Sequence, residues 1–282
     1  MRFMILRKAD ACTEAGILPE EKLLAAMGQY NEELLKAGVM RAGEGLQPSA
    51  TGVRLRFSHG KTTVIDGPFS ETKELIAGFS MFEVPSKDEA IAWVKRWPAL
   101  DGDGNVEIEL REVGCANGLC GSEPTPAQAD AASKQRYMVL LKSDSNTEAT
   151  VDPGEQRLAA MARCNEDSVK AGIMLAGDGL QPTSRGARVK FAGGKPTVID
   201  GPFAETKELI AGFWIIRTAS KQEAIEWVRR YPYPRDANAE FEVEIRKVYE
   251  ADDFGAAFTP ELREAEARMR EHLAESGKQL GS

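Results

Sequence analysis

Acidic and basic side chains recur at fixed spacing in a phrase that the chain contains twice. "TVIDGPFSETKELIAGF" begins at Thr63, and "TVIDGPFAETKELIAGF" begins at Thr197. The charged residues of the phrase are Asp66, Glu71, Lys73 and Glu74 in the first copy and Asp200, Glu205, Lys207 and Glu208 in the second. A carboxylate in an apolar cleft has a raised pKa and can act as a general base, whereas an ion pair with lysine holds the pKa down. Asp66 and Asp200 are therefore candidate catalytic residues, and the sequence leaves both electrostatic states open.

The "DGPF" part of the phrase is also typical of a turn. The aspartate can bond its own backbone, the glycine can take a positive φ, and the proline fixes the next φ. In this interpretation Phe69 and Phe203 are buried anchors of the turn. A turn does not explain the charged "ETKE" that follows it. The functional interpretation places Asp66 at the rim of a cleft, with Lys73 or Arg111 as its charge partner.

A second set of charges lies on the segment "VEIELREV", in which apolar and charged residues alternate strictly. The alternation predicts a strand with Glu109 and Arg111 on one face. The favoured interpretation is a solvated face; the sharper one points Arg111 and its counterpart Arg246 into a cleft to bind an anion. The candidate ligand-binding residues are Glu71, Lys73, Arg111, Glu205, Lys207 and Arg246.

The chain is a tandem repeat. Equivalent residues of the two copies are 134 positions apart, and near the end of the second copy they are 135 positions apart. The repeat predicts two modules, residues 1–113 and 136–248. A linker rich in Gly, Ala, Ser and Pro, residues 114–135, joins them, and a tail covers residues 249–282. The copies are nearly identical around Asp66 and differ in the hairpin beside it, so one constraint acts on both phrases.

Each module reads as strand, helix, strand, hairpin, strand, helix, strand. This order predicts an α+β fold of the ferredoxin-like type with an added hairpin. Two helices cover only one face of such a sheet, yet "RFMILRK" and "LIAGFSMFEV" are apolar on both faces. We therefore expect the two sheets to pack face to face within one chain, related by a pseudo-twofold axis.

At this point a resemblance becomes specific. "DGPFSETKE" and "DGPFAETKE", with "AGVMRAGEGLQP" and "EIELREV", resemble the DGPF-domain branch of the YciI-related proteins. The resemblance covers both modules and implies the dimeric α+β barrel fold. Barrels of this kind include muconolactone isomerases, small monooxygenases and haem-binding proteins. Genes of the branch often lie beside those for extracytoplasmic-function sigma factors, which implies an accessory role in such a regulon.

Composition excludes several classes of function. The formal net charge of −8 disfavours direct binding to nucleic acid or to an acidic membrane surface. No apolar stretch is long enough to cross a bilayer, and the four cysteines form no CxxC pair, so a cytoplasmic location is expected. His59 and His272 have no histidine counterpart in the other copy, which disfavours a haem or zinc site. We expect no metal and no cofactor.

Two functions from different classes remain. One is a protein that binds a small polar or anionic molecule in an inter-sheet cleft. The other is a cofactor-free isomerase or lyase that transfers protons through Asp66 and Asp200. The tail contains a predicted helix with Thr259 as its N-cap and Phe254 and Phe258 as anchors. We expect this helix to dock on the protein itself or on a second copy in a homodimer.

Overall fold

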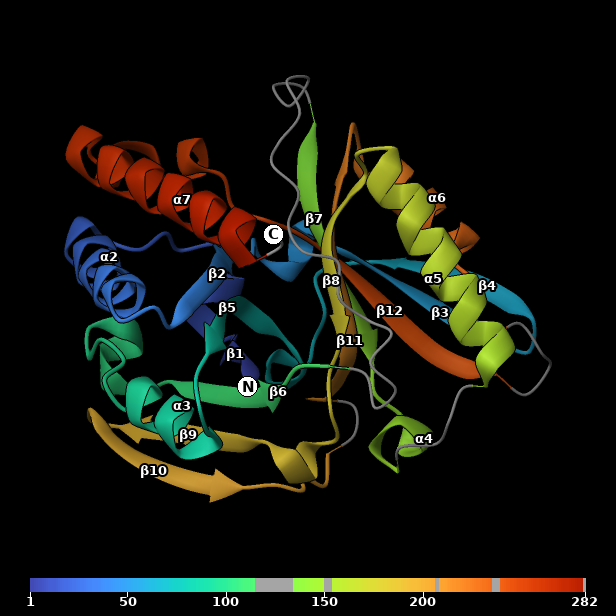
Figure 1. Ribbon diagram of the computed structural model, residues 1–282, viewed down its shortest axis with the longest axis horizontal. Helices are drawn as coiled ribbons and strands as arrows, with labels where there is room; N and C mark the ends of the chain where they lie inside the picture. The colour runs from blue at the N-terminus through green and yellow to red at the C-terminus, as the bar shows by residue number, and fades with distance from the viewer. Residues whose placement is uncertain (115–133, 150–153, 206–207, 235–238, 281–282) are drawn as a thin grey trace.

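The computed structural model describes residues 1–114, 134–149, 154–205, 208–234 and 239–280. These residues form two six-stranded antiparallel sheets that carry helices on their outer faces (Figure 1). Most of the predicted linker lies outside the described residues, as do Cys115, Cys120 and Lys207.

The order of the strands across each sheet differs from their order along the chain. From edge to edge, the first sheet contains β10 (Lys195–Asp200), β9 (Ala187–Ala192), β6 (Glu107–Glu112), β1 (Arg2–Lys8), β5 (Ile76–Glu83) and β2 (Met40–Gly45). The second sheet contains β4 (Lys61–Asp66), β3 (Val53–Ser58), β12 (Glu240–Lys247), β7 (Gln135–Lys142), β11 (Ile210–Thr218) and β8 (Met174–Gly179). The helices are α1 (Ala11–Glu14), α2 (Glu21–Lys36), α3 (Lys87–Val94), α4 (Ser145–Glu148), α5 (Glu155–Lys170), α6 (Lys221–Arg230) and α7 (Pro260–Leu280). Short 3-10 helices include η1 (Ser49–Thr51), η2 (Thr72–Glu74), η3 (Asp101–Gly104), η5 (Thr183–Arg185) and η7 (Ala251–Ala257).

Each hairpin belongs to the sheet of the other repeat. The first-repeat hairpin β3–β4 extends the second sheet, because β3 pairs with β12 and places Phe57 opposite Phe241. The second-repeat hairpin β9–β10 extends the first sheet through β6, so gold strands lie beside a green one in Figure 1. The sequence predicted each hairpin as part of its own module. Alternation identifies the buried face of a strand but not the strand edge that it occupies, which is why the exchange was missed.

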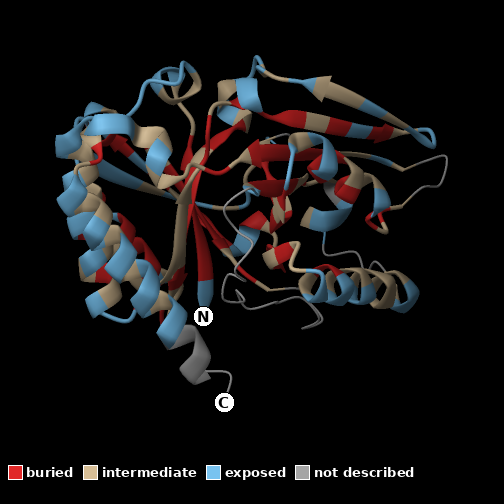
Figure 2. Ribbon diagram, turned by 90° about the horizontal axis from the view of Figure 1, so that it is seen from above, coloured by how far each residue is buried: buried red, intermediate tan, exposed pale blue. Residues whose placement is uncertain are grey.

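The core has three layers, coloured red in Figure 2. On β1, Phe3 and Ile5 pack against the helices of the first sheet, whereas Met4 and Leu6 point towards the other sheet. The layer between the sheets takes side chains from both, and Phe79 packs against Phe213 with 6.1 Å between ring centroids. The two sheets therefore face each other, as the doubly apolar strands predicted.

Helices α3 and α6 begin where the capping residues predicted, whereas α2 begins at Glu21, two residues after the Pro19 expected in its first turn. Ser86 accepts a hydrogen bond from the backbone of Glu89 at 3.2 Å, and Ser220 accepts the equivalent bond from Glu223 at 3.2 Å. These bonds satisfy backbone N–H groups in the first turns of α3 and α6, which have no carbonyl acceptor within the helix. Within the described ranges, no helix is both long and apolar enough to span a bilayer.

The tail packs on the body of the chain that carries it. Helix α7 lies along α2 beside β2 (Figure 1), and Met269 packs against the core of the first sheet. Arg270 donates hydrogen bonds to Glu44 at 3.0 and 3.1 Å. Phe254 lies between Tyr249 and Phe258, with centroid distances of 5.0 and 5.7 Å. The expected docking of the tail helix on the protein itself is confirmed.

Candidate functional site

The repeated "DGP" turn is seated on the 3-10 helix that precedes the hairpin. The backbone N–H of Gly67 donates to the carbonyl of Gly52 at 3.3 Å, and Phe69 donates to the Ser49 hydroxyl at 3.1 Å. A Cβ atom on Gly67 would lie 1.9 Å from the carbonyl oxygen of Ser49. The φ angle of Gly67 is not positive, contrary to the expectation from the turn. Close approach of two backbones is therefore what requires glycine here.

Asp66 and Asp200 lie at the surface. Their side chains are 72% and 69% exposed, and their partners are Lys221 at 2.9 Å and Lys87 at 2.8 Å. The expected partners, Lys73 and Arg111, were wrong, and neither carboxylate lies in an apolar cleft. The physical reason is topological: β4 and β10 are edge strands, and the exchanged hairpin brings the end of each strand to a helix of the other repeat. A catalytic role for the two aspartates stays a prediction.

The phenylalanine of each phrase packs under an arginine. Phe69 lies under the guanidinium of Arg54 with 4.1 Å to the ring centroid, and Phe203 lies under Arg188 with 4.2 Å. Both rings are half-buried, so the expectation of fully buried anchors was wrong. The contact is a cation–π interaction between the guanidinium and one face of the ring. A half-buried ring at the edge of the core can make this contact.

The last glutamate of each "ETKE" joins the same arginine. Glu74 lies 3.1 Å from Arg54, and Glu208 lies 3.1 Å from Arg188. The remaining described charges of the motif, Glu71, Lys73 and Glu205, are exposed. The repeated phrase thus supplies a ring and a carboxylate to one arginine. Ligand contacts by the exposed charges stay a prediction.

Between the sheets these arginines belong to two buried charge clusters. The first charge cluster consists of Lys8, Glu109, Arg111, Glu148, Arg188 and Glu208. The second charge cluster consists of Lys142, Glu244, Arg246, Glu14, Arg54 and Glu74. Each cluster contains residues of both repeats. The positions that the first repeat supplies to the first charge cluster are supplied by the second repeat to the second charge cluster, and the reverse also holds.

The interpretation of the charged strand face as solvated was wrong. The side chains of Glu244 and Arg246 are 1% and 0% exposed. Arg246 donates to the carbonyl oxygen of Gln47 at 2.6 Å and to Glu14 at 3.1 Å. The equivalent guanidinium, on Arg111, donates to the carbonyl oxygen of Gln181 at 2.7 Å. Strict alternation looks the same whether the polar face meets water or buried partners, so the sequence could not decide between them.

Burial and charge oppose each other at the centre of the second charge cluster. Burial alone would raise the pKa of the Glu244 carboxyl. The positive charges of Lys142, Arg246 and Arg54 outweigh burial and hold that pKa below its ordinary value. The carboxylate is therefore charged, and its partners are the reason that the charge is tolerated inside the protein.

Two buried lysines were missed by the sequence reasoning. Lys8 and Lys142 end the equivalent strands β1 and β7 and are 7% and 8% exposed. Their amines donate to the carbonyl oxygens of Glu208 at 3.4 Å and Glu74 at 2.8 Å. Burial lowers the pKa of both amines. The signal that could have found them is the 134-residue spacing of two lysines at the ends of apolar strands.

A cleft of about 270 Å³ opens at the end of the first sheet, and Lys8 is among the residues that line it. We call it the Lys8 cleft. Its walls are the ends of β1, β6 and β9, and the residues that line it include Lys8, Asp10, Val106, Glu107, Lys190 and Phe191. Lys8, Lys190, Asp10 and Glu107 bring charged groups to the cleft, and Arg7 lines it as well, although most of the exposed lining is apolar.

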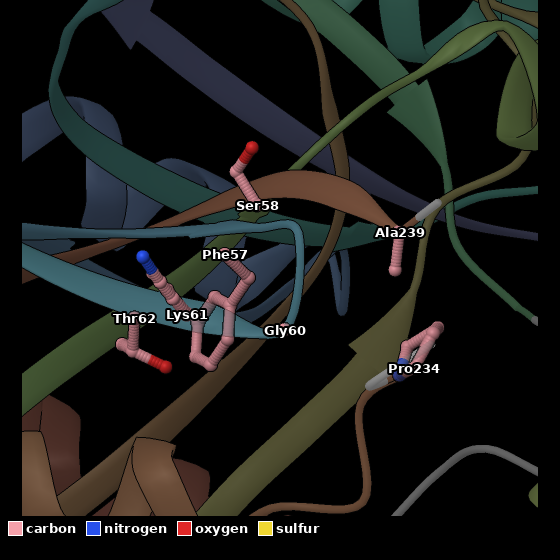
Figure 3. A pocket seen from close by; sticks show the side chains of 7 residues that line it. All are labelled: Phe57, Ser58, Gly60, Lys61, Thr62, Pro234 and Ala239. Carbon is pink, nitrogen blue, oxygen red and sulfur yellow. The ribbon is translucent and has the colours of Figure 1, made fainter. Parts of the chain in front are cut away.

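The equivalent end of the second sheet is filled by aromatic rings. Phe241 stands where the first repeat has Val106, and Tyr233 stands where it has Ala99. Phe241 stacks on Phe57 with 4.5 Å between centroids, and Tyr233 packs against the same ring at 5.7 Å. The small pocket at this end, lined by Phe57 and Pro234 among others, has a volume of about 20 Å³ (Figure 3). The two ends of this pseudo-symmetric protein are therefore chemically different.

No group of three or more His, Cys, Asp or Glu side chains in the described ranges is arranged to hold a metal ion.

A model of the YCII-related domain matches the chain twice, over residues 1–112 and 135–250. The chain belongs to the YCII-related domain family. Its two YCII-related domains supply the two repeats whose hairpins are exchanged.

Individual relatives of this YCII-related chain were compared in sequence and in structure. It is 30% identical over 115 residues to the uncharacterized protein R00369 of Rhizobium meliloti (strain 1021), an alignment that covers 40% of this chain and 93% of the relative. Among solved structures it is similar to a "putative monooxygenase" from Lactobacillus acidophilus NCFM, with 8% identity, a TM-score of 0.39 and coverage of 88% and 92%. It is also similar to an anthrone oxidase-like protein, with 10% identity, a TM-score of 0.32 and coverage of 88% and 90%.

Proposed function

We propose that the chain binds one small polar or anionic molecule, and that the Lys8 cleft is the place of binding. The observation that carries the proposal is a cleft of about 270 Å³ whose lining includes Lys8, Lys190 and Glu107, while the equivalent end of the other sheet is filled by aromatic rings. A concave site with a few convergent polar groups is the usual form of a small-molecule site. The function is therefore binding at one site, although the chain contains two repeats.

The size and the lining of the cleft define the class of ligand. Pockets for drug-sized ligands occupy about 300–1,000 Å³, so this cleft suits a molecule of few heavy atoms. Lys8 and Lys190 offer positive charge to an anionic group, whereas Glu107 can accept hydrogen bonds from a hydroxyl or amine. A small carboxylate that also carries a polar group satisfies both.

We place the ligand at the end of the first sheet rather than between the two sheets. The inter-sheet arginines, Arg111 and Arg246, already donate to backbone carbonyls and lie beside carboxylates of their own clusters. An anion that bound there would have to displace these hydrogen bonds. A buried guanidinium left without its partners strongly destabilises the folded protein. Lys190, in contrast, is exposed at the wall of the Lys8 cleft.

The experiment fills the cleft with the side chain that closes the other end. Val106→Phe reproduces Phe241, and the new ring would face Phe191 as Phe241 faces Phe57. Binding of a panel of small carboxylates and phosphate is measured by calorimetry, after native mass spectrometry has tested the purified protein for a retained molecule. We expect at least about a tenfold loss of affinity, equivalent to about 1.4 kcal/mol.

Val106→Ile, which adds a single methylene, is the matched control and should bind as the natural protein does. Equal affinities of the Phe and Ile variants for a ligand that the natural protein binds would overturn the placement of the site. Proton transfer through Asp66 and Asp200 and an accessory role in a sigma-factor regulon are separate proposals. Neither of these two proposals involves Val106, so the experiment tests only binding in the cleft.

A further inference from the structure

Lys8 and Lys142 form a natural comparison inside one chain. They end equivalent strands, they are almost equally buried, and each amine donates to a backbone carbonyl. Lys142 also has a carboxylate, Glu244, 3.9 Å from its amine; among the residues that the structure describes, no such ion pair involves Lys8. Lys8 is in addition the one that lines the open cleft. Of the two lysines, the one without a described carboxylate ion pair is thus the one that lines the cleft.

The charged groups around Lys8 come from β6, from β9 beyond it and from the segment before β11, whereas β5 places the apolar Ile76 opposite Lys8. They are Glu107 and Glu109 on β6, Arg188 on β9 and Glu208 before β11. Burial lowers the pKa of the Lys8 amine and Arg188 lowers it further, whereas the three carboxylates oppose them, and the net direction is downward. A larger fraction of this amine than of an ordinary lysine is therefore neutral near pH 7, and the neutral form carries the lone pair that attacks electrophiles.

We propose that Lys8 is a nucleophile that condenses with the carbonyl carbon of a small aldehyde or 2-oxo acid held in the Lys8 cleft. This inference rests on the proposed binding function and narrows its ligand to a carbonyl compound. Lys190 lines the same cleft from β9, which is separated from β1 by β6, and can receive the carboxylate of a 2-oxo acid. Glu107, opposite Lys190 in the sheet, can accept and return a proton, whereas the other carboxylate of the cleft, Asp10, is held by Arg7 at 2.7 Å.

The reaction conserves atoms and electrons without a further reactant. The neutral Lys8 amine forms a bond to the carbonyl carbon, and one of its two protons passes through Glu107 to the carbonyl oxygen to give a carbinolamine. Glu107 then takes the second nitrogen proton and gives it to the hydroxyl, which leaves as water while the carbon–nitrogen double bond forms. One amine and one carbonyl compound yield one imine and one water, and nothing is oxidised or reduced.

The test uses the complete natural protein, with glyoxylate as the probe and cyanoborohydride to reduce any imine to a stable carboxymethyl-lysine. Peptide mass spectrometry then gives the rate of modification of each lysine between about pH 6 and pH 9. One unit of lowered pKa raises the neutral fraction of an amine about tenfold below its pKa. We expect Lys8 to be modified at least about tenfold faster than Lys142, because Lys8 lines the cleft that admits the probe and Lys142 is paired with Glu244. Lys8 should also react faster than the exposed Lys61 near neutral pH, because burial lowers the pKa of Lys8.

Two further arms separate this inference from the binding proposal. Glycolate resembles glyoxylate but has no carbonyl carbon, so it can occupy the cleft without reacting. Protection of Lys8 by glycolate, and loss of its modification in Val106→Phe, would support both proposals. Glycolate binding that is sensitive to Val106→Phe, with Lys8 modified no faster than Lys142, would overturn the nucleophile and leave the binding site. If glycolate does not bind and Lys8 is not modified selectively, both proposals are overturned: that Lys8 is a nucleophile, and that the cleft binds an anion of this size.

Discussion

The amine of Lys221 lies 2.9 Å from a carboxylate oxygen of Asp66, although the two residues are 155 positions apart in the chain. Lys87 and Asp200 make the reciprocal contact at 2.8 Å. Each aspartate of the repeated phrase is thus held by the first residue of a helix from the other repeat. The contact is a consequence of hairpin exchange, because only the exchanged hairpin brings the end of β4 to α6.

The first prediction concerns the double change Asp66→Asn with Asp200→Asn. Both side chains are largely exposed, so the loss of two surface ion pairs should change the free energy of unfolding by less than about 1 kcal/mol. Asparagine also keeps the turn, and urea unfolding measures the difference. Ligand binding in the Lys8 cleft should be retained. Loss of binding or activity in a fully folded double variant would instead support proton transfer by the aspartates.

The second prediction concerns the glycine of the same turn. Gly67→Ala places a Cβ atom 1.9 Å from the Ser49 carbonyl oxygen, which forces two backbones apart. We expect a loss of about 3 kcal/mol or more in the free energy of unfolding. Gly28→Ala is the control, because its new Cβ meets nothing within 4 Å and alanine favours a helix. A Gly67→Ala protein as stable as the Gly28→Ala protein would contradict the close approach.

Much of the architecture could be read from the chain. The apolar pattern of β1 predicted that both faces of the sheet are covered, and Ser86 and Ser220 predicted two helix starts. The pairing of the hairpins could not be predicted, because an alternating strand fits any free edge of either sheet. The difference between Val106 and Phe241 is visible in the sequence. Only the fold shows that this difference opens one end of the molecule and fills the other.

The charge clusters illustrate a second limit. Arg54 and its counterpart Arg188 are retained, as are Phe57, Gly60 and Lys61, in a hairpin whose other positions differ between the copies, which is a signal of a shared constraint. Besides Glu74, Arg54 is paired with Glu244, which is 190 positions away and in the other repeat. Spacing along the chain carries no information about such a contact. Lys8 was missed for a similar reason, since a lysine at the end of an apolar strand is also typical of an exposed strand end.

The third prediction concerns Asp178, which is paired with Arg2 at 2.9 Å. Burial raises its pKa from 3.8 to about 6, although Arg2 opposes the shift. The folded protein therefore keeps this proton to a higher pH than the unfolded chain, and the free energy of unfolding falls as pH rises from about 4 to about 6. Asp178→Asn removes this fall, so its stability relative to the natural protein should increase across the window by on the order of 2 kcal/mol.

Urea unfolding at a series of pH values measures the effect on Asp178→Asn. Asp88→Asn, at an exposed position on α3, makes the same change of net charge and is the control. If both variants follow the natural protein in parallel from about pH 4 to about pH 7, the raised pKa of Asp178 is wrong.

The fourth prediction concerns the tail. Removal of residues 254–282 takes away the ion pairs of Arg270 with Glu44 and the packing of Met269 on the first core. We expect the melting temperature to fall by on the order of 5 °C, which corresponds to one or two kcal/mol for a protein of this size. Calorimetry measures the change, and sedimentation shows whether the tail also joins two chains in a homodimer. An unchanged melting temperature and an unchanged molecular mass would contradict a stabilising role for α7.

The fifth prediction concerns the centre of the second charge cluster. Glu244→Gln leaves Arg54, Arg246 and Lys142 buried without their shared carboxylate. Removing one partner of a buried ion pair costs about 3–5 kcal/mol, so we expect a loss of that size at neutral pH. Because the pKa of Glu244 in the folded protein lies below its unfolded value of 4.5, its stabilisation is present above about pH 4.5 and is lost on acidification. The natural protein should therefore lose stability more steeply than Glu244→Gln as the pH falls below that value.

The controls for Glu244→Gln come from the same chain. Glu109→Gln makes the equivalent change in the first charge cluster, next to Arg111 and Arg188, and should have a similar effect. Glu71→Gln removes an exposed carboxylate and should change the free energy of unfolding by less than about 0.5 kcal/mol. Urea unfolding from about pH 3 to about pH 7 compares the three variants with the natural protein. A Glu244→Gln protein with the stability of Glu71→Gln and the acid sensitivity of the natural protein would show that the buried carboxylate does not hold the arginines between the sheets.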